Sequence, residues 1–185
     1  MKISIMSRSM AVQAMQSNLH GEKTVIISIT EPGFDIPDFK NKDLLAVYPM
    51  HFWDIEEPLG DWLPASREDV RGIREFIDRY RDAAQHILVH CAAGISRSSA
   101  AAAAISEYLG IEHQIFSIRR YRPNMHVYRL MCEEFGIVKT QKDYEALAKN
   151  RRKSLFEGQD REGNPLKSFP HNFPHFPPRK YEKYP

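Results

Sequence analysis

The stretch HILVHCAAGISRSSAAAAAISEYLG, residues 86–110, decides the fold. It opens with an apolar run of β type, HILVHC, and closes with small residues at helical spacing that end at Gly110, a residue type common just after a helix. A strand, a short loop and a helix in this order are typical of α/β proteins, which bind ligands at the carboxyl ends of their strands. We therefore predict a strand at 86–91, a helix at 96–110 and a ligand-binding loop between them.

Strand-like runs precede this unit. Residues 2–6 (KISIM) and 24–30 (TVIISIT) have strand composition, and the second run shows no polar alternation. Such a run is typical of a strand buried on both faces of a parallel sheet. A further apolar run at 43–53 predicts a third strand, interrupted at Pro49.

Helical spacing of apolar residues separates and follows these strands. Ser66 and Asp69 form a capping-box pattern at the start of one such segment. Strands that alternate with helices predict an α/β domain with a central, mainly parallel sheet of four to five strands flanked by helices. We place this domain at residues 1–154, with predicted helices at 7–18, 66–80, 96–110, 111–120, 124–136 and 141–153.

The last part of the chain has a different composition. The whole sequence holds 26 Lys+Arg and 24 Asp+Glu, but residues 151–185 hold eight and four of these, together with six of the twelve prolines. Proline removes backbone donors and favours extended conformations. We expect residues 155–185 to form a Pro-, Phe- and His-rich extended tail and not a second core.

Composition also excludes several classes of protein. A net charge of +2 gives no electrostatic case for a nucleic-acid partner, and no stretch approaches the ~18 apolar residues of a membrane span. Two cysteines exclude a disulfide scaffold and a Cys-rich zinc module. We expect a cytoplasmic protein with no metal, no cofactor, no nucleic-acid partner and no membrane partner, and the sequence leaves its oligomeric state open.

The loop HCAAGISRS, residues 90–98 and called the signature loop below, has the residues that phosphate chemistry needs. Unpaired N–H groups at a helix N-terminus bind anions, and Gly94 permits the backbone turn that points amides at a ligand. This field favours the thiolate form of Cys91, and Arg97 offers a planar fork for two phosphate oxygens. The alternative is a structural cysteine in a strand-to-helix turn.

The pattern His-Cys-x-x-Gly-x-x-Arg-Ser resembles the signature of the cysteine-based protein tyrosine and dual-specificity phosphatases. The stretches FWDIEEPLGDWLPASREDVRGIREFI (52–77) and ILVHCAAGISRSSAAA (87–102) resemble a small bacterial branch of predicted tyrosine phosphatases. The resemblance covers about residues 1–140. It implies a one-domain α/β phosphatase that forms a covalent phosphocysteine intermediate and uses no metal.

The same resemblance implies a role for each residue of the signature loop. Cys91 would be the nucleophile, and Arg97 would bind the phosphoryl group. Ser98 would hydrogen-bond the thiolate and help the phosphocysteine break down, while His90 would orient the loop and favour the thiolate. The backbone amides of the loop would hold the substrate phosphate, contributed by Ala92, Ala93, Gly94, Ile95, Ser96 and Arg97.

The mechanism also needs a general acid to protonate the leaving oxygen. Two aspartates stand in the acidic loop at 54–65. The similar bacterial branch places its aspartate just before Ile-x-Glu-Pro, which matches Asp54. Asp61 lies nearer Cys91 in the sequence, at a spacing similar to that of many dual-specificity enzymes. We favour Asp54 and keep Asp61 as the alternative.

The resemblance implies a phosphomonoester hydrolase that acts on a phosphorylated protein, with phosphotyrosine favoured, or on a small phosphate ester. The signature loop has no lysine of the kind that phosphoinositide phosphatases place there. Two other functions stay open: a module that binds phosphate or phosphoproteins without turnover, and a rhodanese-type sulfurtransferase. Three arginines, Arg119, Arg120 and Arg122, could anchor an acidic substrate or form a solvated helix end.

Overall fold

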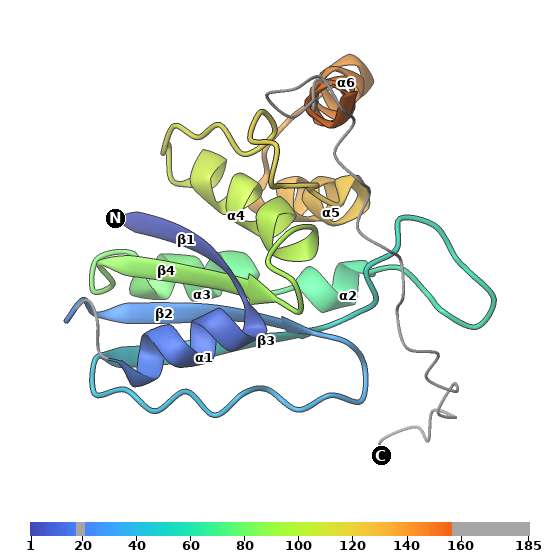
Figure 1. Cartoon of the computed structure of the whole chain (residues 1–185). Helices are drawn as coiled ribbons and strands as arrows, with labels where there is room; N and C mark the ends of the chain where they lie inside the picture. The colour runs from blue at the N-terminus through green and yellow to red at the C-terminus, as the bar shows by residue number, and fades with distance from the viewer. Residues whose placement is uncertain (18–20, 157–185) are drawn as a thin grey trace, which may run out of the picture.

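The computed structural model describes residues 1–17 and 21–156, with side chains up to residue 150. Four parallel strands form one central sheet in the order β1-β4-β2-β3 (Figure 1). This confirms the predicted parallel sheet, at the lower of the two expected strand numbers. The strands are β1 (Lys2–Ser7), β2 (Thr24–Thr30), β3 (Leu44–His51) and β4 (His86–Cys91).

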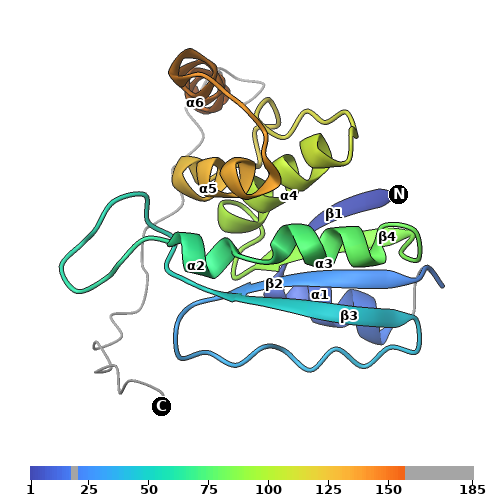
Figure 2. The ribbon, with the colours of Figure 1, turned by 180° about the vertical axis from the view of Figure 1, so that it is seen from behind.

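Helices cover both faces of this sheet. Helix α1 lies on one face and α3 on the other, as the opposite views in Figures 1 and 2 show. Helices α4 and α5 pack against each other on the α3 side of the sheet. The helices are α1 (Arg8–Gln16), α2 (Arg67–Val70), α3 (Ile73–Tyr80), α4 (Arg97–Tyr108), α5 (Met125–Phe135) and α6 (Gln141–Phe156).

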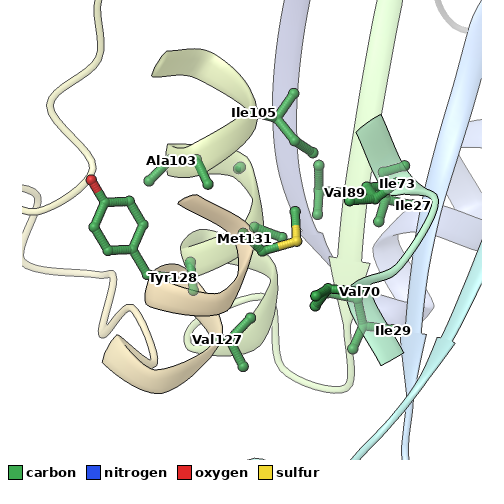
Figure 3. Close-up of a cluster of buried hydrophobic side chains, with 14 of the residues drawn as sticks. Ile27, Ile29, Val70, Ile73, Val89, Ala103, Ile105, Val127, Tyr128 and Met131 are labelled. Atoms are coloured by element: carbon green, nitrogen blue, oxygen red, sulfur yellow. The ribbon is translucent and has the colours of Figure 1, made fainter. Parts of the chain in front are cut away.

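Strand β2 is buried along its whole length, as its unbroken β-branched sequence predicts. Successive side chains of a strand point to opposite faces of the sheet. Accordingly Ile27 and Ile29 join the larger apolar cluster under α3, α4 and α5, which Figure 3 shows, whereas Ile26 joins the smaller cluster under α1. Both faces of the strand are therefore covered by helices.

Strand β3 passes through Pro49 without a break, although the sequence predicts an interruption there. The reason is its place at the edge of the sheet, where it pairs only with β2. An edge strand leaves one side of its backbone without ladder hydrogen bonds, so the missing N–H of a proline costs little there.

The helix predicted at 66–80 is two helices. The capping box between Ser66 and Asp69 forms as expected, but α2 ends at Val70 and α3 begins at Ile73. Gly72 between them adopts a φ of +83°, and its amide donates to the Glu134 carboxylate. Partners elsewhere in the fold therefore stabilise a break that the apolar spacing does not reveal.

The helix predicted at 111–120 is absent, and this segment forms turns. Its apolar residues Ile115 and Phe116 are buried in the main cluster, so their spacing reflects packing of an irregular segment. The last predicted helices are present as α5 and α6. The proposed division of the chain after residue 154 stays a prediction, since residues 157–185 lie outside the described residues.

Two further features concern the described residues only. None of their helices is long and apolar enough to cross a bilayer. No group of three or more of their His, Cys, Asp or Glu side chains could hold a metal ion.

Helix α4 is anchored to its neighbours through Glu107. The buried Tyr128 of α5 donates its hydroxyl to this carboxylate at 2.6 Å, and Lys139 lies 2.8 Å from the other oxygen. Burial by itself would raise the pKa of Glu107, but hydrogen bonds from His113, Lys139 and Tyr128 lower it to about 2. The ionised carboxylate therefore holds α4, and the signature loop that precedes it, against α5.

We expect Glu107→Gln to remove part of the acid sensitivity of the fold. Because the folded pKa lies below the ordinary value of 4.5, this carboxylate stabilises the fold above about pH 4.5 and loses that effect as the pH falls toward 2. Urea unfolding at pH 7 and pH 3 measures the free energy of unfolding. Between these two pH values that of wild type should fall by on the order of 1–2 kcal/mol more than that of the variant. Glu112→Gln, on the exposed neighbouring turn, should behave as wild type, and equal acid sensitivity of wild type and Glu107→Gln would contradict the assignment.

Candidate active site

The signature loop leaves the carboxyl edge of the sheet from an inner strand. Strand β4 lies between β1 and β2, so the ends of those two strands flank the loop on both sides. Cys91 pairs with Ser7 in the register of β1 and β4, and the Arg8 amide donates to the Ala92 carbonyl at 3.3 Å. Residues that directly follow β1 and β2 are thereby brought next to Cys91 and Arg97.

Cys91 lies at the bottom of the loop, 1% exposed. The Gly94 amide donates to its sulfur at 3.3 Å, and the Ser98 hydroxyl lies 3.2 Å from the same atom. Ser98 belongs to the first turn of α4. These contacts hold the Cys91 sulfur between the turn at Gly94 and the start of α4.

Gly94 packs against the backbone of β1. Its φ is +71°, and a Cβ atom placed on it would lie 2.5 Å from the Met6 carbonyl carbon and from the Ser7 nitrogen. Both the conformation and the contact need a residue without a side chain. Glycine here lets the loop curl tightly enough for its amide to reach Cys91.

Arg97 is almost wholly buried, at 3% exposed, and three segments surround its guanidinium. Nη1 donates to the carbonyl of Phe52 at 2.9 Å, Nη2 pairs with the Glu31 carboxylate, and Nε lies 3.9 Å from Oδ2 of Asp54. A buried guanidinium is tolerated only when such partners offset its desolvation. They hold its planar fork beside the loop.

Glu31 links Arg97 to a second arginine. Its other oxygen accepts from Nη2 of Arg8 at 2.8 Å, and the Arg8 guanidinium lies over the ring of Phe34. Burial opposes ionisation of Glu31, but the charge and hydrogen bond of Arg97, aided by Arg8, lower its pKa below the ordinary value. Sequence analysis misses Glu31, although its position directly after β2 is a signal, since that strand adjoins β4.

Asp54 lies against the signature loop. Its Oδ1 accepts from the Ser96 hydroxyl at 2.7 Å and from the Asn124 side-chain amide at 3.0 Å. Asp61 is exposed and has no hydrogen bond or ion pair within the part of the chain that the structure describes. Of the two aspartates considered for the general acid, only Asp54 is brought to the loop.

Asn124 is a second residue that sequence analysis misses. It caps α5 by accepting from the Val127 amide at 3.0 Å, and its side-chain nitrogen donates to Asp54 and to the Ile55 carbonyl. An asparagine before a helix is a visible N-cap signal. Its contact with a loop 70 positions earlier depends on the packing of α5 and has no sequence signal.

His90 is fully buried at the end of β4, where its Nε2 lies 2.8 Å from the Ser28 hydroxyl of β2. Burial lowers the pKa of His90 to about 4, so the ring is neutral at neutral pH. A neutral ring supplies no full positive charge to Cys91. The contact with Ser28 fixes the position of the ring, and the orienting role of His90 stays a prediction.

The outer face of the loop is accessible, because Ala92, Ala93 and Ile95 are exposed. A tetrahedral anion held there would meet backbone N–H groups of the loop and the N-terminus of α4. A separate cavity of about 650 Å³ lies at the far end of α4, lined by residues 107 and 111–114, and includes none of these groups. The loop arrangement can bind a phosphoryl group and present a nucleophile to it.

We expect Gly94→Ala to destabilise the fold more than a glycine substitution made at a similar φ in open space. Gly33, with a φ of +82° and no atom near its position for Cβ, is the matched control. The strained backbone conformation should lower the free energy of unfolding of both variants by about 1–2 kcal/mol. Overlap of the new Cβ atom with β1 should lower that of Gly94→Ala by about 1–3 kcal/mol more. Denaturant unfolding measures the difference, and equal losses would show that the loop does not need this close approach.

Comparison with known proteins shows which solved structures have a similar fold. No protein-family model and no curated protein sequence matches the chain. Among solved structures, the human tyrosine phosphatase-like serine/threonine/tyrosine-interacting protein superposes with a TM-score of 0.53 at 23% identity, over 73% of this chain and 91% of that one. Human DUSP28 is also similar, with a TM-score of 0.45 at 12% identity over 84% of this chain and 95% of that one. A mouse putative dual specificity phosphatase has a TM-score of 0.42 at 13% identity, over 83% of this chain and 82% of that one. The chain thus shares the fold of that human tyrosine phosphatase-like protein.

Proposed function

We propose that the protein is a metal-independent phosphomonoester hydrolase that acts through a phosphocysteine on Cys91. One observation carries the proposal: the Gly94 amide donates to the Cys91 sulfur and the Ser98 hydroxyl lies 3.2 Å from it, in a loop that ends at the buried Arg97. A thiolate so placed is an activated nucleophile aimed at the phosphorus of a bound phosphate ester.

In the first step the Cys91 thiolate attacks phosphorus and the P–O bond to the leaving group breaks. The leaving oxygen takes a proton from the protonated carboxyl group of Asp54. Arg97 and the loop amides bind the equatorial oxygens, whose negative charge is greatest in the transition state. The products of this step are the free alcohol or phenol and a phosphoryl group on Cys91.

In the second step water attacks the phosphocysteine. The Asp54 carboxylate takes a proton from that water, the S–P bond breaks, and inorganic phosphate leaves with the thiolate restored. Ser98, 3.2 Å from the sulfur, donates a hydrogen bond to the leaving thiolate. The donors around Asp54 support this proposal, since they hold its carboxyl group next to the loop.

The proposed substrate is a phosphorylated protein, with phosphotyrosine favoured, or a small ester with one phosphate. The loop between Cys91 and Arg97 has only small or apolar side chains and one serine, so it offers no cation to a second phosphate on the same ring. A module that only binds phosphoproteins would need neither an acid at the loop nor a hydroxyl at the sulfur. Both are present, which favours turnover.

We expect Cys91→Ser to abolish hydrolysis of p-nitrophenyl phosphate while the chain still binds phosphate, because an alcohol in this site is a far weaker nucleophile than a thiolate. The loss should exceed a thousandfold without added metal, measured as kcat. Cys132→Ala is the control, since burial raises the pKa of that thiol to about 11 and keeps it protonated. Undiminished turnover by Cys91→Ser would contradict the proposal. Cleavage of thiosulfate in place of ester hydrolysis by wild type would indicate a sulfurtransferase.

Asp54→Asn and Asp61→Asn should separate the two candidate acids. With an unactivated ester such as a phosphotyrosine peptide, Asp54→Asn should lower kcat about a hundredfold or more, and the loss should be smaller with p-nitrophenyl phosphate, whose leaving group needs little protonation. Asp61→Asn should stay within about twofold of wild type on both substrates, because its exposed carboxylate contacts no site residue. A large loss confined to Asp61→Asn would reverse the assignment.

A further inference from the structure

Residues 119–122, called the arginine segment below, are tied to the signature loop through the backbone. The Arg122 amide donates to the Ile95 carbonyl at 2.9 Å, and two residues later the Asn124 amide donates to the Ser96 carbonyl at 3.4 Å. Ile95 and Ser96 are part of the signature loop. The arginine segment therefore lies at the rim of the candidate active site and is not the end of a helix.

Two of its arginines face solvent. Arg122 holds the turn, because its guanidinium donates to the carbonyls of Arg119 and Tyr121 at 3.0 and 3.1 Å. Arg119 and Arg120 are exposed, and Arg120 lies over the ring of Tyr121. Among the described residues neither Arg119 nor Arg120 forms an ion pair, so the positive charges of both are available to an incoming anion.

We propose that the arginine segment binds acidic side chains next to the phosphorylated residue of a protein substrate. The inference rests on the proposed phosphatase function and adds that its protein substrates carry acidic residues next to the phosphorylated one. Arg119 lies three positions before Arg122, so its Cα atom lies within about 11 Å of the Cα atom of Arg122, the residue that contacts Ile95. An extended peptide advances ~3.3 Å per residue. Acidic residues within about three positions of the phosphorylated residue therefore reach the arginine segment.

The surrounding charges favour a peptide over a membrane surface. Binding to anionic lipid usually involves about four to eight clustered basic residues, whereas two arginines are exposed here. The neighbouring loop carries the exposed acidic residues Glu56 and Glu57, and the Glu56 carboxylate accepts from the Met125 amide near the end of the arginine segment. A flat anionic surface would meet these carboxylates, while a narrow peptide can pass beside them.

The test compares matched phosphotyrosine peptides that carry Glu, Gln or Lys at the three positions on each side. Wild type should prefer the Glu peptide in kcat/KM, and the double variant Arg119→Gln/Arg120→Gln should lose about threefold to tenfold on that peptide alone. Its kcat on p-nitrophenyl phosphate should be unchanged. The preference should weaken between 50 mM and 500 mM salt, because exposed charges are screened.

Arg79→Gln/Arg81→Gln removes the same charge near the other end of β4 and should leave the peptide preference intact. Equal kcat/KM for the Glu and Lys peptides in wild type, or an equal loss in this control, would overturn the proposal. So would hydrolysis that depends on Arg119 and Arg120 only when the substrate is a phosphoinositide in phosphatidylcholine vesicles, which would assign the segment to a lipid surface.

Binding separates this inference from the proposed activity. In the Cys91→Ser chain, fluorescence anisotropy of the labelled Glu and Lys phosphopeptides measures docking without turnover. Tighter binding of the Glu peptide that Arg119→Gln/Arg120→Gln abolishes would support the arginine segment even if wild type hydrolysed no ester. Equal binding of both peptides would contradict it even if wild type proved to be an active phosphatase.

Discussion

The burial of one cation, the guanidinium of Arg97, is the constraint on which the site depends. A charge that is 3% exposed must be matched by nearby partners, and here they come from the segment after β2, the end of β3 and the loop that carries Asp54. Each of these segments is thereby held at the same edge of the sheet. The position of Asp54 beside the signature loop and the orientation of the Arg97 fork are consequences of the same set of contacts.

The ion pairs of Glu31 with Arg8 and Arg97 also leave the site nearly balanced in charge before a substrate binds. Glu31 is ionised between Arg8 and Arg97, and the neutral His90 adds no positive charge. The attraction for a phosphate dianion must then come largely from the loop amides and the N-terminus of α4, together with Nε of Arg97, which has no hydrogen-bond partner among the described residues. Such a site suits a single phosphate, and charge selection beyond it falls to exposed groups at the rim such as Arg119 and Arg120.

How far the sequence predicts this arrangement depends on whether a contact is local. The strand, loop and helix around Cys91 follow from residues close together in the chain, and so do the buried strand β2 and the capping box at Ser66. The break at Gly72 and the irregular segment 111–120 do not, because contacts with distant parts of the fold decide both. The same holds for Glu31 and Asn124, whose side chains reach the site through the order of the strands and the packing of α5.

The central claim is that the phosphoryl group passes through the Cys91 sulfur. Its most direct test is rapid acid quenching of wild type mixed with a phosphotyrosine peptide, followed by mass spectrometry of the fragment that contains the signature loop. The account predicts a phosphoryl group on Cys91 that appears within one turnover and decays as inorganic phosphate forms. Hydrolysis with no phosphorylated intermediate, or with the phosphoryl group on another residue, would contradict it.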